Sequence, residues 1–211
     1  MTWHGSAKPD GYVLGLCGAH GTGKSTILQG VKAAGYPVDE SQLSRAAQKM
    51  LGWNDLKPAQ ESVENMWALQ DAVLTAMYDR DKRINDSKIL TLVDRTPADV
   101  WGYTMLWMMR LDNIGEENRR REQEFRQACR VLSSQYAKHI IVPIRDEIAF
   151  VAEKNRADAD SREFHARHVM NFVAGHLDKH IVETIDPADR VEEVVNVIKN
   201  EQYVIDMMTP K

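Results

Sequence analysis

The sequence predicts an α/β protein in which helices cover both faces of a parallel sheet. Short apolar runs with strand character alternate with segments of helical periodicity along the chain. A glycine-rich turn joins the first of these runs directly to the first helical segment. Strands separated by helices pair in parallel, and the carboxyl ends of parallel strands form the edge where such sheets bind ligands. We therefore expect functional residues at the strand ends.

The first expected elements alternate at short intervals. Residues 12–17 form an apolar run before the glycine turn, and residues 24–34 carry apolar side chains on one helical face. Residues 36–38 form a short second strand. Ser41 is a suitable N-cap for the next helix, and Gly52 is a suitable stop for it.

The middle of the chain contains the clearest strand between two helices. Pro58 suits the first turn of a helix that continues to about Asn85. Residues 88–93 are mostly apolar or β-branched, which is typical of a buried strand. Thr96 then caps an aromatic, Met-rich helix that ends near Arg110.

The last third repeats the alternation. Residues 116–136 form a polar helix, and residues 139–142 form a strand. Residues 162–177 are helical, residues 180–185 form the fifth strand, and residues 186–200 form a final helix that opens with Asp-Pro. The length of 211 residues suits one domain.

The domain is expected to cover residues 11–200, with a tail at residues 1–10 and a C-terminal extension at residues 201–211. A charged segment at about residues 145–162 is expected to form a lid.

The composition excludes several classes of protein. It is ordinary for a globular chain, with 43% hydrophobic and 27% charged residues. The net charge of −4 argues against a protein that coats nucleic acid by bulk charge. Two cysteines are too few for a disulfide framework, no apolar run is long enough for a membrane helix, and the first ten residues lack a signal-peptide layout. We therefore expect a cytoplasmic protein without membrane contact.

Residues 18–25 match the Walker A phosphate-binding pattern in full, with a strand before them and a helix after them. Glycines let consecutive amides face an anion, and the helix N-terminus adds partial positive charge. Lys24 is expected to bridge the β- and γ-phosphates of ATP, and Ser25 to bind Mg²⁺. The alternatives for His20 are a variable loop position, which we favour, and a catalytic base. The expected nucleotide-binding residues are Gly18, Ala19, His20, Gly21, Thr22, Gly23, Lys24, Ser25 and Thr26.

Three acidic residues lie at expected strand ends. Asp94 is expected to hold Mg²⁺ directly or through water, the alternative being a charge that only stabilises the next helix. Asp39 or Glu40 is expected to accept a proton from an acceptor hydroxyl, the alternative being a solvated loop pair. Because side chains alternate along a strand, Asp39 and Glu40 should face opposite ways, and the sequence does not decide between them.

Arginines supply candidate contacts to phosphate and acceptor. Arg156 and Arg162 flank the charged lid segment and are expected to close over the transferring phosphoryl group, with Arg167 as a weaker candidate. A solvated helix start is the alternative. Arg95 and Arg45 are expected to hold the acceptor, and for Arg45 an ordinary surface position is equally compatible with the sequence.

Aromatic residues after Arg95 are candidates for stacking on a planar acceptor. They are Trp101, Tyr103 and Trp107, and core packing is the alternative for them. The basic run at residues 119–121 is surrounded by glutamates, so an ion-paired exposed helix is expected there rather than a phosphate contact.

These motifs together resemble the P-loop nucleoside and nucleotide kinases. The segment Asp94–Tyr103 resembles the group that contains the kinase domain of nicotinamide-ribosyl regulators and phage-encoded kinases, including phage kinases of hydroxymethylated pyrimidines in DNA. The resemblance covers about residues 12–200. It implies a three-layer P-loop kinase fold, with a parallel five-stranded sheet and an arginine-bearing lid, and it places residues 185–188 near the adenine.

The expected function is an ATP- and Mg²⁺-dependent phosphotransferase, monomeric or homodimeric, whose acceptor is a hydroxyl or monophosphate of a nucleoside-type molecule. One alternative is a phage-encoded kinase, acting in host cytoplasm, of a modified base in DNA. Another is an ATPase or GTPase switch, but the chain lacks the guanine-specific Asn/Thr-Lys-x-Asp run and an added helical domain. The last alternative is a scaffold protein that binds a nucleotide without turning it over. The sequence does not identify the acceptor.

Overall fold

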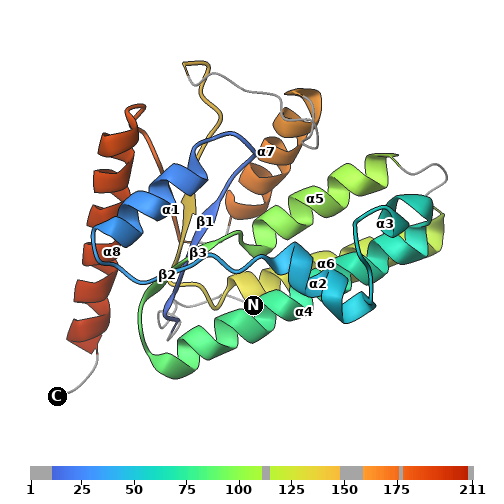
Figure 1. Cartoon of the computed structure of the whole chain (residues 1–211), viewed down its shortest axis with the longest axis horizontal. Coiled ribbons are helices and arrows are strands. Elements are labelled where there is room, and N and C mark those ends of the chain that lie inside the picture. The colour runs from blue at the N-terminus through green and yellow to red at the C-terminus, as the bar shows by residue number, and fades with distance from the viewer. Residues whose placement is uncertain (1–10, 111–114, 148–158, 176–177, 209–211) are drawn as a thin grey trace.

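The computed structural model describes residues 11–110, 115–147, 159–175 and 178–208. Its centre is a five-stranded sheet in the order β2-β3-β1-β4-β5, and every neighbouring pair is parallel (Figure 1). The strands are β1 Val13–Cys17, β2 Val38–Asp39, β3 Thr91–Asp94, β4 Lys138–Ile141 and β5 Lys179–Ile181. The predicted α/β fold with a parallel five-stranded sheet is thus confirmed.

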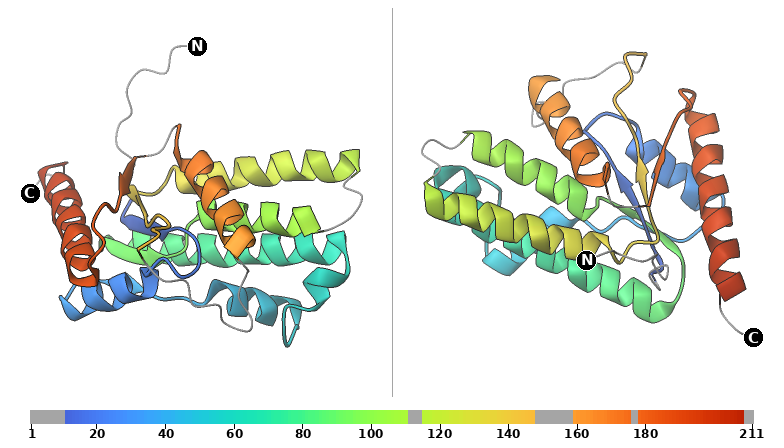
Figure 2. Two further views of the ribbon diagram at one scale, coloured as in Figure 1. Left: turned by 90° about the horizontal axis from the view of Figure 1, so that it is seen from above. Right: turned by 180° about the vertical axis from the view of Figure 1, so that it is seen from behind.

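Helices cover both faces of the sheet, which gives three layers (Figures 1 and 2). One face carries α1 Lys24–Ala33 and α8 Pro187–Met208. The other layer contains α2 Leu43–Leu51, α3 Pro58–Glu61, α4 Val63–Ser87, α5 Pro97–Arg110, α6 Glu116–Ser133 and α7 Ala159–Val173. Among the described residues, no helix is long and apolar enough to cross a membrane.

Alternation along the strands decides which strand-end residues face which layer. In β1, Leu14 and Leu16 pack in the core under α1 and α8, whereas Val13 and Cys17 belong to the core on the other face. Asp94 is the register partner of Leu16 on the neighbouring strand. Paired residues of parallel strands point to the same face, so Asp94 lies on the face of the sheet that α1 covers.

One predicted N-cap is wrong, and one predicted helix is interrupted although it begins at Pro58 as predicted. Helix α2 begins at Leu43, so Gln42 and not Ser41 occupies the N-cap position, and the backbone N–H of Ser41 donates to Asp39 Oδ1 at 2.8 Å. The single helix predicted from Pro58 is divided into α3 and α4. Ser62 has an extended backbone at this break, and its Oγ accepts from Asn65 N–H at 3.1 Å as the N-cap of α4.

The C-terminal elements also differ from the prediction. Strand β5 ends at Ile181 instead of Ile185, because the N–H groups of residues 183–184 donate to the carboxylate of Glu193 instead of extending the sheet. Helix α8 continues to Met208 without a break at residue 200, so the predicted C-terminal extension begins inside a helix.

Candidate active site

The loop between β1 and α1 is shaped as an anion cradle. Its first glycine, Gly18, has φ +138°, and a Cβ there would lie 2.4 Å from the carbonyl oxygen of Val142. Gly23, with φ +92°, turns the chain into α1, whose first intrahelical bond runs from Ile27 N–H to Gly23 C=O at 3.1 Å. The amides before Ile27 lie at the N-terminus of the helix and are oriented to bind a phosphate.

Lys24 points back over this loop. Its Nζ donates to the carbonyl oxygens of Gly18 and Ala19, at 2.6 Å each. Burial lowers the pKa of the Lys24 ammonium, and the carboxylates of Asp99 and Asp94 oppose this shift. The ammonium therefore lies partly buried within the loop, where a phosphate oxygen can replace the carbonyl partners.

Asp99, for which no role was expected, holds the start of the phosphate loop. Its buried carboxylate accepts from Gly18 N–H at 3.0 Å through Oδ1. Through Oδ2 it accepts from the N–H and the hydroxyl of Thr96, at 2.8 and 3.1 Å. The spacing Thr-x-x-Asp is close to the capping-box pattern. This pattern was the feature of the sequence that could have predicted a hydrogen bond between Asp99 and the backbone at the helix start.

Arg95 and Tyr103 lie together beyond the end of β3. The Arg95 guanidinium lies 4.8 Å from the centroid of the Tyr103 ring, and Arg95 is a non-glycine residue with φ +67°. The Tyr103 hydroxyl hydrogen-bonds to Nε2 of His20 in the phosphate loop. The structure thus brings the two predicted acceptor contacts, Arg95 and Tyr103, next to the nucleotide-binding loop.

Helix α7 contacts the loop through Arg162 and His165. Arg162 Nε donates to the carbonyl oxygen of His20 at 2.9 Å, and its Nη2 donates to that of Gly21 at 3.4 Å. The ring of His165 lies 4.1 Å from that of Tyr103 and stacks at 6.4 Å on that of His20. One predicted lid arginine therefore lies at the loop, whereas residues 148–158 of the predicted lid, with Arg156, lie outside the described residues. Arg167 is exposed on α7.

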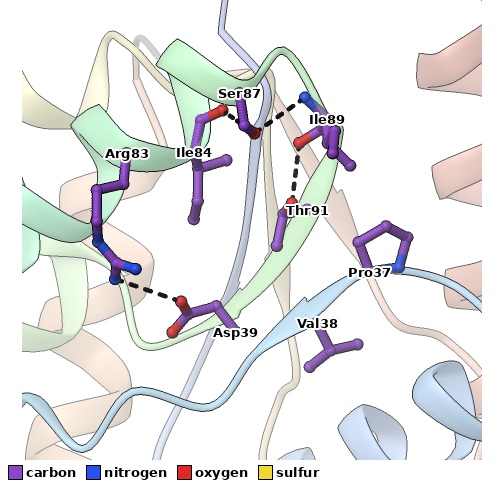
Figure 3. Close-up of a pocket in the computed structure, with 8 residues that line it drawn as sticks. All are labelled: Pro37, Val38, Asp39, Arg83, Ile84, Ser87, Ile89 and Thr91. Atoms are coloured by element: carbon purple, nitrogen blue, oxygen red, sulfur yellow. Dashed lines mark hydrogen bonds and ion pairs between the residues drawn. The ribbon is translucent and has the colours of Figure 1, made fainter.

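Asp39 and Glu40 diverge at the end of β2, as strand alternation predicts. Asp39 accepts from Ser41 N–H and forms an ion pair with Arg83 of α4, at 3.7 Å (Figure 3). Glu40 pairs instead with Lys32 of α1 at 3.3 Å, in an exposed position. Within the described residues, no hydrogen bond or ion pair joins either carboxylate to the phosphate loop. A cavity of about 400 Å³ lies beside Asp39, lined by Pro37, Val38, Asp39, Arg83, Ile84, Ser87, Ile89 and Thr91.

Other candidates lie farther from the loop. Arg45 is exposed on α2. Trp101 is buried in the core, 6.5 Å from the ring of Phe172, and Trp107 packs against the same core, so Tyr103 is the predicted aromatic that contacts the phosphate loop. In the basic run on α6, Arg120 pairs with the neighbouring Glu124, as expected, whereas Arg121 pairs with Asp71 of α4.

A second cavity, of about 630 Å³, continues from the end of the phosphate loop. It is lined by Gly23, Thr26, Ile27, Glu147, Ile185, Asp186, Pro187 and Arg190. Three residues of the segment expected near a nucleotide base therefore line a cavity that adjoins the loop. Arg190, which the sequence analysis missed, is buried and donates to the carbonyl oxygens of Thr22 at 2.7 Å and Thr184 at 2.9 Å. It ties α8 to the phosphate loop.

Glu193 holds the chain segment that leads into this cavity, and this predicts a pH effect. Burial raises the pKa of Glu193, but hydrogen bonds from Thr184, Glu183 and His180 outweigh it and hold the pKa at about 2. The ionised form is therefore favoured in the folded state. Its contribution to the free energy of unfolding is present above about pH 4.5 and is lost as the pH falls toward about 2.

We expect Glu193→Gln to destabilise the protein at pH 7 and to have a smaller effect near pH 3. Urea unfolding of both proteins across this range measures the difference. An equal difference at every pH would contradict this account of Glu193.

The oxygen donors at the loop fit Mg²⁺. Ser25 lies exposed in the first turn of α1, and Asp94 ends β3 on the face that α1 covers. Hydroxyl and carboxylate oxygens are suitable Mg²⁺ ligands, and Mg²⁺ bound with a nucleotide usually keeps several waters and phosphate oxygens. Among the described residues no group of three or more His, Cys, Asp or Glu could hold a metal ion, so a dedicated all-protein metal cage is not found there.

A parallel sheet with this strand order and a complete phosphate loop defines the P-loop nucleotide-binding proteins. Residues 14–192 match the family model described as an AAA domain. The chain therefore belongs to this AAA domain family. None of the curated proteins compared with the chain matches it.

Solved structures share the fold at low sequence identity. The structure of deoxyadenosine kinase from M. mycoides with dCMP and dCDP bound is 14% identical, with a TM-score of 0.63, and the match covers 89% of this chain and 99% of that one. Thymidylate kinase from Ehrlichia chaffeensis is 12% identical, with a TM-score of 0.57 and coverages of 89% and 97%. The NadR protein in complex with NR is 15% identical, with a TM-score of 0.62 and 89% of this chain covered. This chain spans about half of NadR, 51% of its length.

Proposed function

We propose that the protein is an ATP- and Mg²⁺-dependent phosphotransferase that moves the γ-phosphate to a nucleoside-type acceptor. One observation carries the proposal. The phosphate loop is enclosed by groups of complementary charge, with Lys24 and Arg162 on its carbonyls and Arg95 over the Tyr103 ring that contacts His20. Phosphoryl transfer depends on positioning and on stabilising the charge of the moving group, which such cations provide.

Each residue has a defined task in this proposal. The loop amides and Lys24 bind the triphosphate, and Arg162 exchanges its carbonyl partners for the transferring phosphoryl group. Ser25 and Asp94 would hold Mg²⁺, which supplies neutralisation of the phosphate charge when bound. Arg95 and Tyr103 hold the acceptor, and the cavity beside Gly23 accepts the base of the nucleotide.

We assign the role of proton acceptor on β2 to Asp39. Its carboxylate is fixed by Ser41 N–H and Arg83, and its charge acts on Arg80, which hydrogen-bonds to the backbone of Asp94. Glu40 is exposed and pairs with Lys32 on the opposite face. Asp39 is therefore the better-restrained base on the acceptor side of the sheet.

Matched substitutions of the two carboxylates separate the acceptor classes. With a hydroxyl acceptor, Asp39→Asn is expected to lower kcat by about a hundredfold or more, because the general base is lost, while Glu40→Gln has a small effect. With a monophosphate acceptor both variants should retain most of their activity, since the phosphate is already a good nucleophile. Full activity of both variants on a hydroxyl would contradict the assignment of a base to β2.

The class of reaction is tested by following ADP formation with pooled nucleosides, pooled monophosphates, or DNA with hydroxymethylated pyrimidines. ADP formation that depends on one pool supports a phosphotransferase and names its acceptor class. ADP formation at the same rate with and without every acceptor would instead support a P-loop ATPase. The DNA acceptor has less support, because Arg120 and Arg121 of the basic run pair with acidic side chains.

A further inference from the structure

A buried arginine on α4 contacts the backbone of the candidate metal and acceptor residues. Arg80 is 1% exposed. Its Nη1 donates to the carbonyl oxygen of Asp94 at 2.8 Å, and its Nη2 donates to that of Arg95 at 3.2 Å. Both carbonyls lie at the point where β3 ends, so a single guanidinium bridges the two residues.

Two further side chains contact the guanidinium. Arg80 Nε donates to Asp81 Oδ1 at 2.8 Å, and Nη2 also donates to the Tyr136 hydroxyl at 3.0 Å. The Tyr136 hydroxyl in turn donates to Asp81 Oδ2 at 2.7 Å. We call Arg80, Asp81 and Tyr136 the Arg80 cluster. Its three members are hydrogen-bonded to one another, and two further N–H groups of Arg80 donate to the backbone of residues 94–95.

The backbone at this point needs support. Arg95 has φ +67°, a left-handed conformation that costs a non-glycine residue about 1–2 kcal/mol. Its N–H is held by the carbonyl oxygen of Leu16 at 3.1 Å, and its carbonyl is held by Arg80. The strand register places Asp94 on the α1 face, and the turn that follows it brings the Arg95 guanidinium over Tyr103.

We propose that Arg80 is a positioning residue whose bonds to the carbonyls of Asp94 and Arg95 fix the left-handed turn at Arg95 and thereby align Asp94 for Mg²⁺ and Arg95 for the acceptor. The charge-assisted bond to Asp81 holds the guanidinium in place for this task. The proposal rests on the proposed function for the roles of Asp94 and Arg95. Stability alone does not require such a cluster, because well-packed apolar residues often replace buried ion pairs without loss.

The test compares Arg80→Lys with Tyr136→Phe. Lysine keeps the charge but cannot make both carbonyl bonds while bound to Asp81, whereas Tyr136→Phe removes one hydroxyl from the same cluster and leaves the carbonyl bonds of Arg80. We expect Arg80→Lys to lower kcat and to raise the Mg²⁺ concentration needed for half-maximal activity, each by about tenfold to a hundredfold. We expect Tyr136→Phe to lower Tm and leave both quantities within about threefold of wild type.

A binding measurement keeps this test separate from the proposed function. Affinity for a fluorescent ATP analogue is titrated with and without Mg²⁺, with no acceptor present. Arg80→Lys should leave the affinity for the analogue unchanged without Mg²⁺, and it should reduce the increase in affinity that Mg²⁺ produces. If wild type binds nucleotide with Mg²⁺ but transfers no phosphate, the proposed function fails while this binding comparison still decides the role of Arg80.

The triple variant Arg80→Met/Asp81→Leu/Tyr136→Phe replaces the whole Arg80 cluster with apolar side chains, so it provides a second test if Arg80→Lys does not fold. It should fold and show the same loss of Mg²⁺ coupling. Unchanged Mg²⁺ coupling in a folded Arg80 variant would overturn the proposal. An equal loss of coupling in Tyr136→Phe would also overturn it.

Discussion

Lys24→Met is expected to lower kcat for phosphoryl transfer by about a thousandfold, because it removes the cation that the phosphate loop holds for the transferring phosphate. The Lys24 ammonium is bonded to two loop carbonyls, and its pKa is lowered by burial. Its position over the loop is therefore maintained without direct contact to a carboxylate. Methionine keeps the length and packing of the side chain, so we expect the free energy of unfolding to change by about 1 kcal/mol or less.

Steady-state transfer rates and urea unfolding measure the two effects of Lys24→Met. The matched control is Lys199→Met, at an exposed position on α8. It should leave both kcat and stability unchanged. Activity of Lys24→Met within tenfold of wild type would contradict the role given to the phosphate loop.

Asp99→Ala is expected to destabilise the protein by about 3 kcal/mol, because it leaves several buried donors without their acceptor. The donors are the N–H of Gly18 and both the N–H and hydroxyl of Thr96. The same change frees the first glycine of the phosphate loop, so nucleotide affinity should fall with stability. Asp99→Asn keeps one side-chain carbonyl as an acceptor, so it should lose less stability and less nucleotide affinity than Asp99→Ala.

The chain contains its own control for Asp99. Helices α5 and α8 both begin with Pro-Ala-Asp, but Asp99 is fully buried whereas Asp189 is exposed in the first turn of α8. Asp189→Ala should cost only the small interaction of a surface charge with a helix N-terminus, about 0.5 kcal/mol. Urea unfolding of both variants measures the contrast, and equal losses would show that Asp99 acts only as a helix-start charge.

These two helix starts show why part of the site was not predictable. The residues Pro-Ala-Asp are the same at both, although Thr96 precedes one and Asp186 the other, and the neighbouring elements decide which aspartate is buried. Arg80 is a similar case, since it lies in the charged run Asp79–Arg83, which resembles a solvated helix face. Its spacing of three residues from Met77 and four from Ile84 places it on the buried stripe of α4, and that periodicity was the one local signal.

The predictable features were those encoded locally. Alternating apolar runs and amphipathic helices predicted the parallel sheet, and the pattern from Gly18 to Ser25 predicted the phosphate loop with its flanking strand and helix. The extent of β5 was not predictable, because Glu193, ten residues along the chain, takes the N–H groups of its expected continuation. Local periodicity carries no information about that contact.

The most direct test of the account is single-turnover incubation of the purified protein with γ-labelled ATP, Mg²⁺ and the pooled nucleoside-type acceptors. The account predicts that the label moves to an organic phosphate, that free phosphate stays near background, and that Lys24→Met abolishes the transfer. Label released only as free phosphate at a rate independent of every acceptor, or label that stays on ATP, would contradict the account.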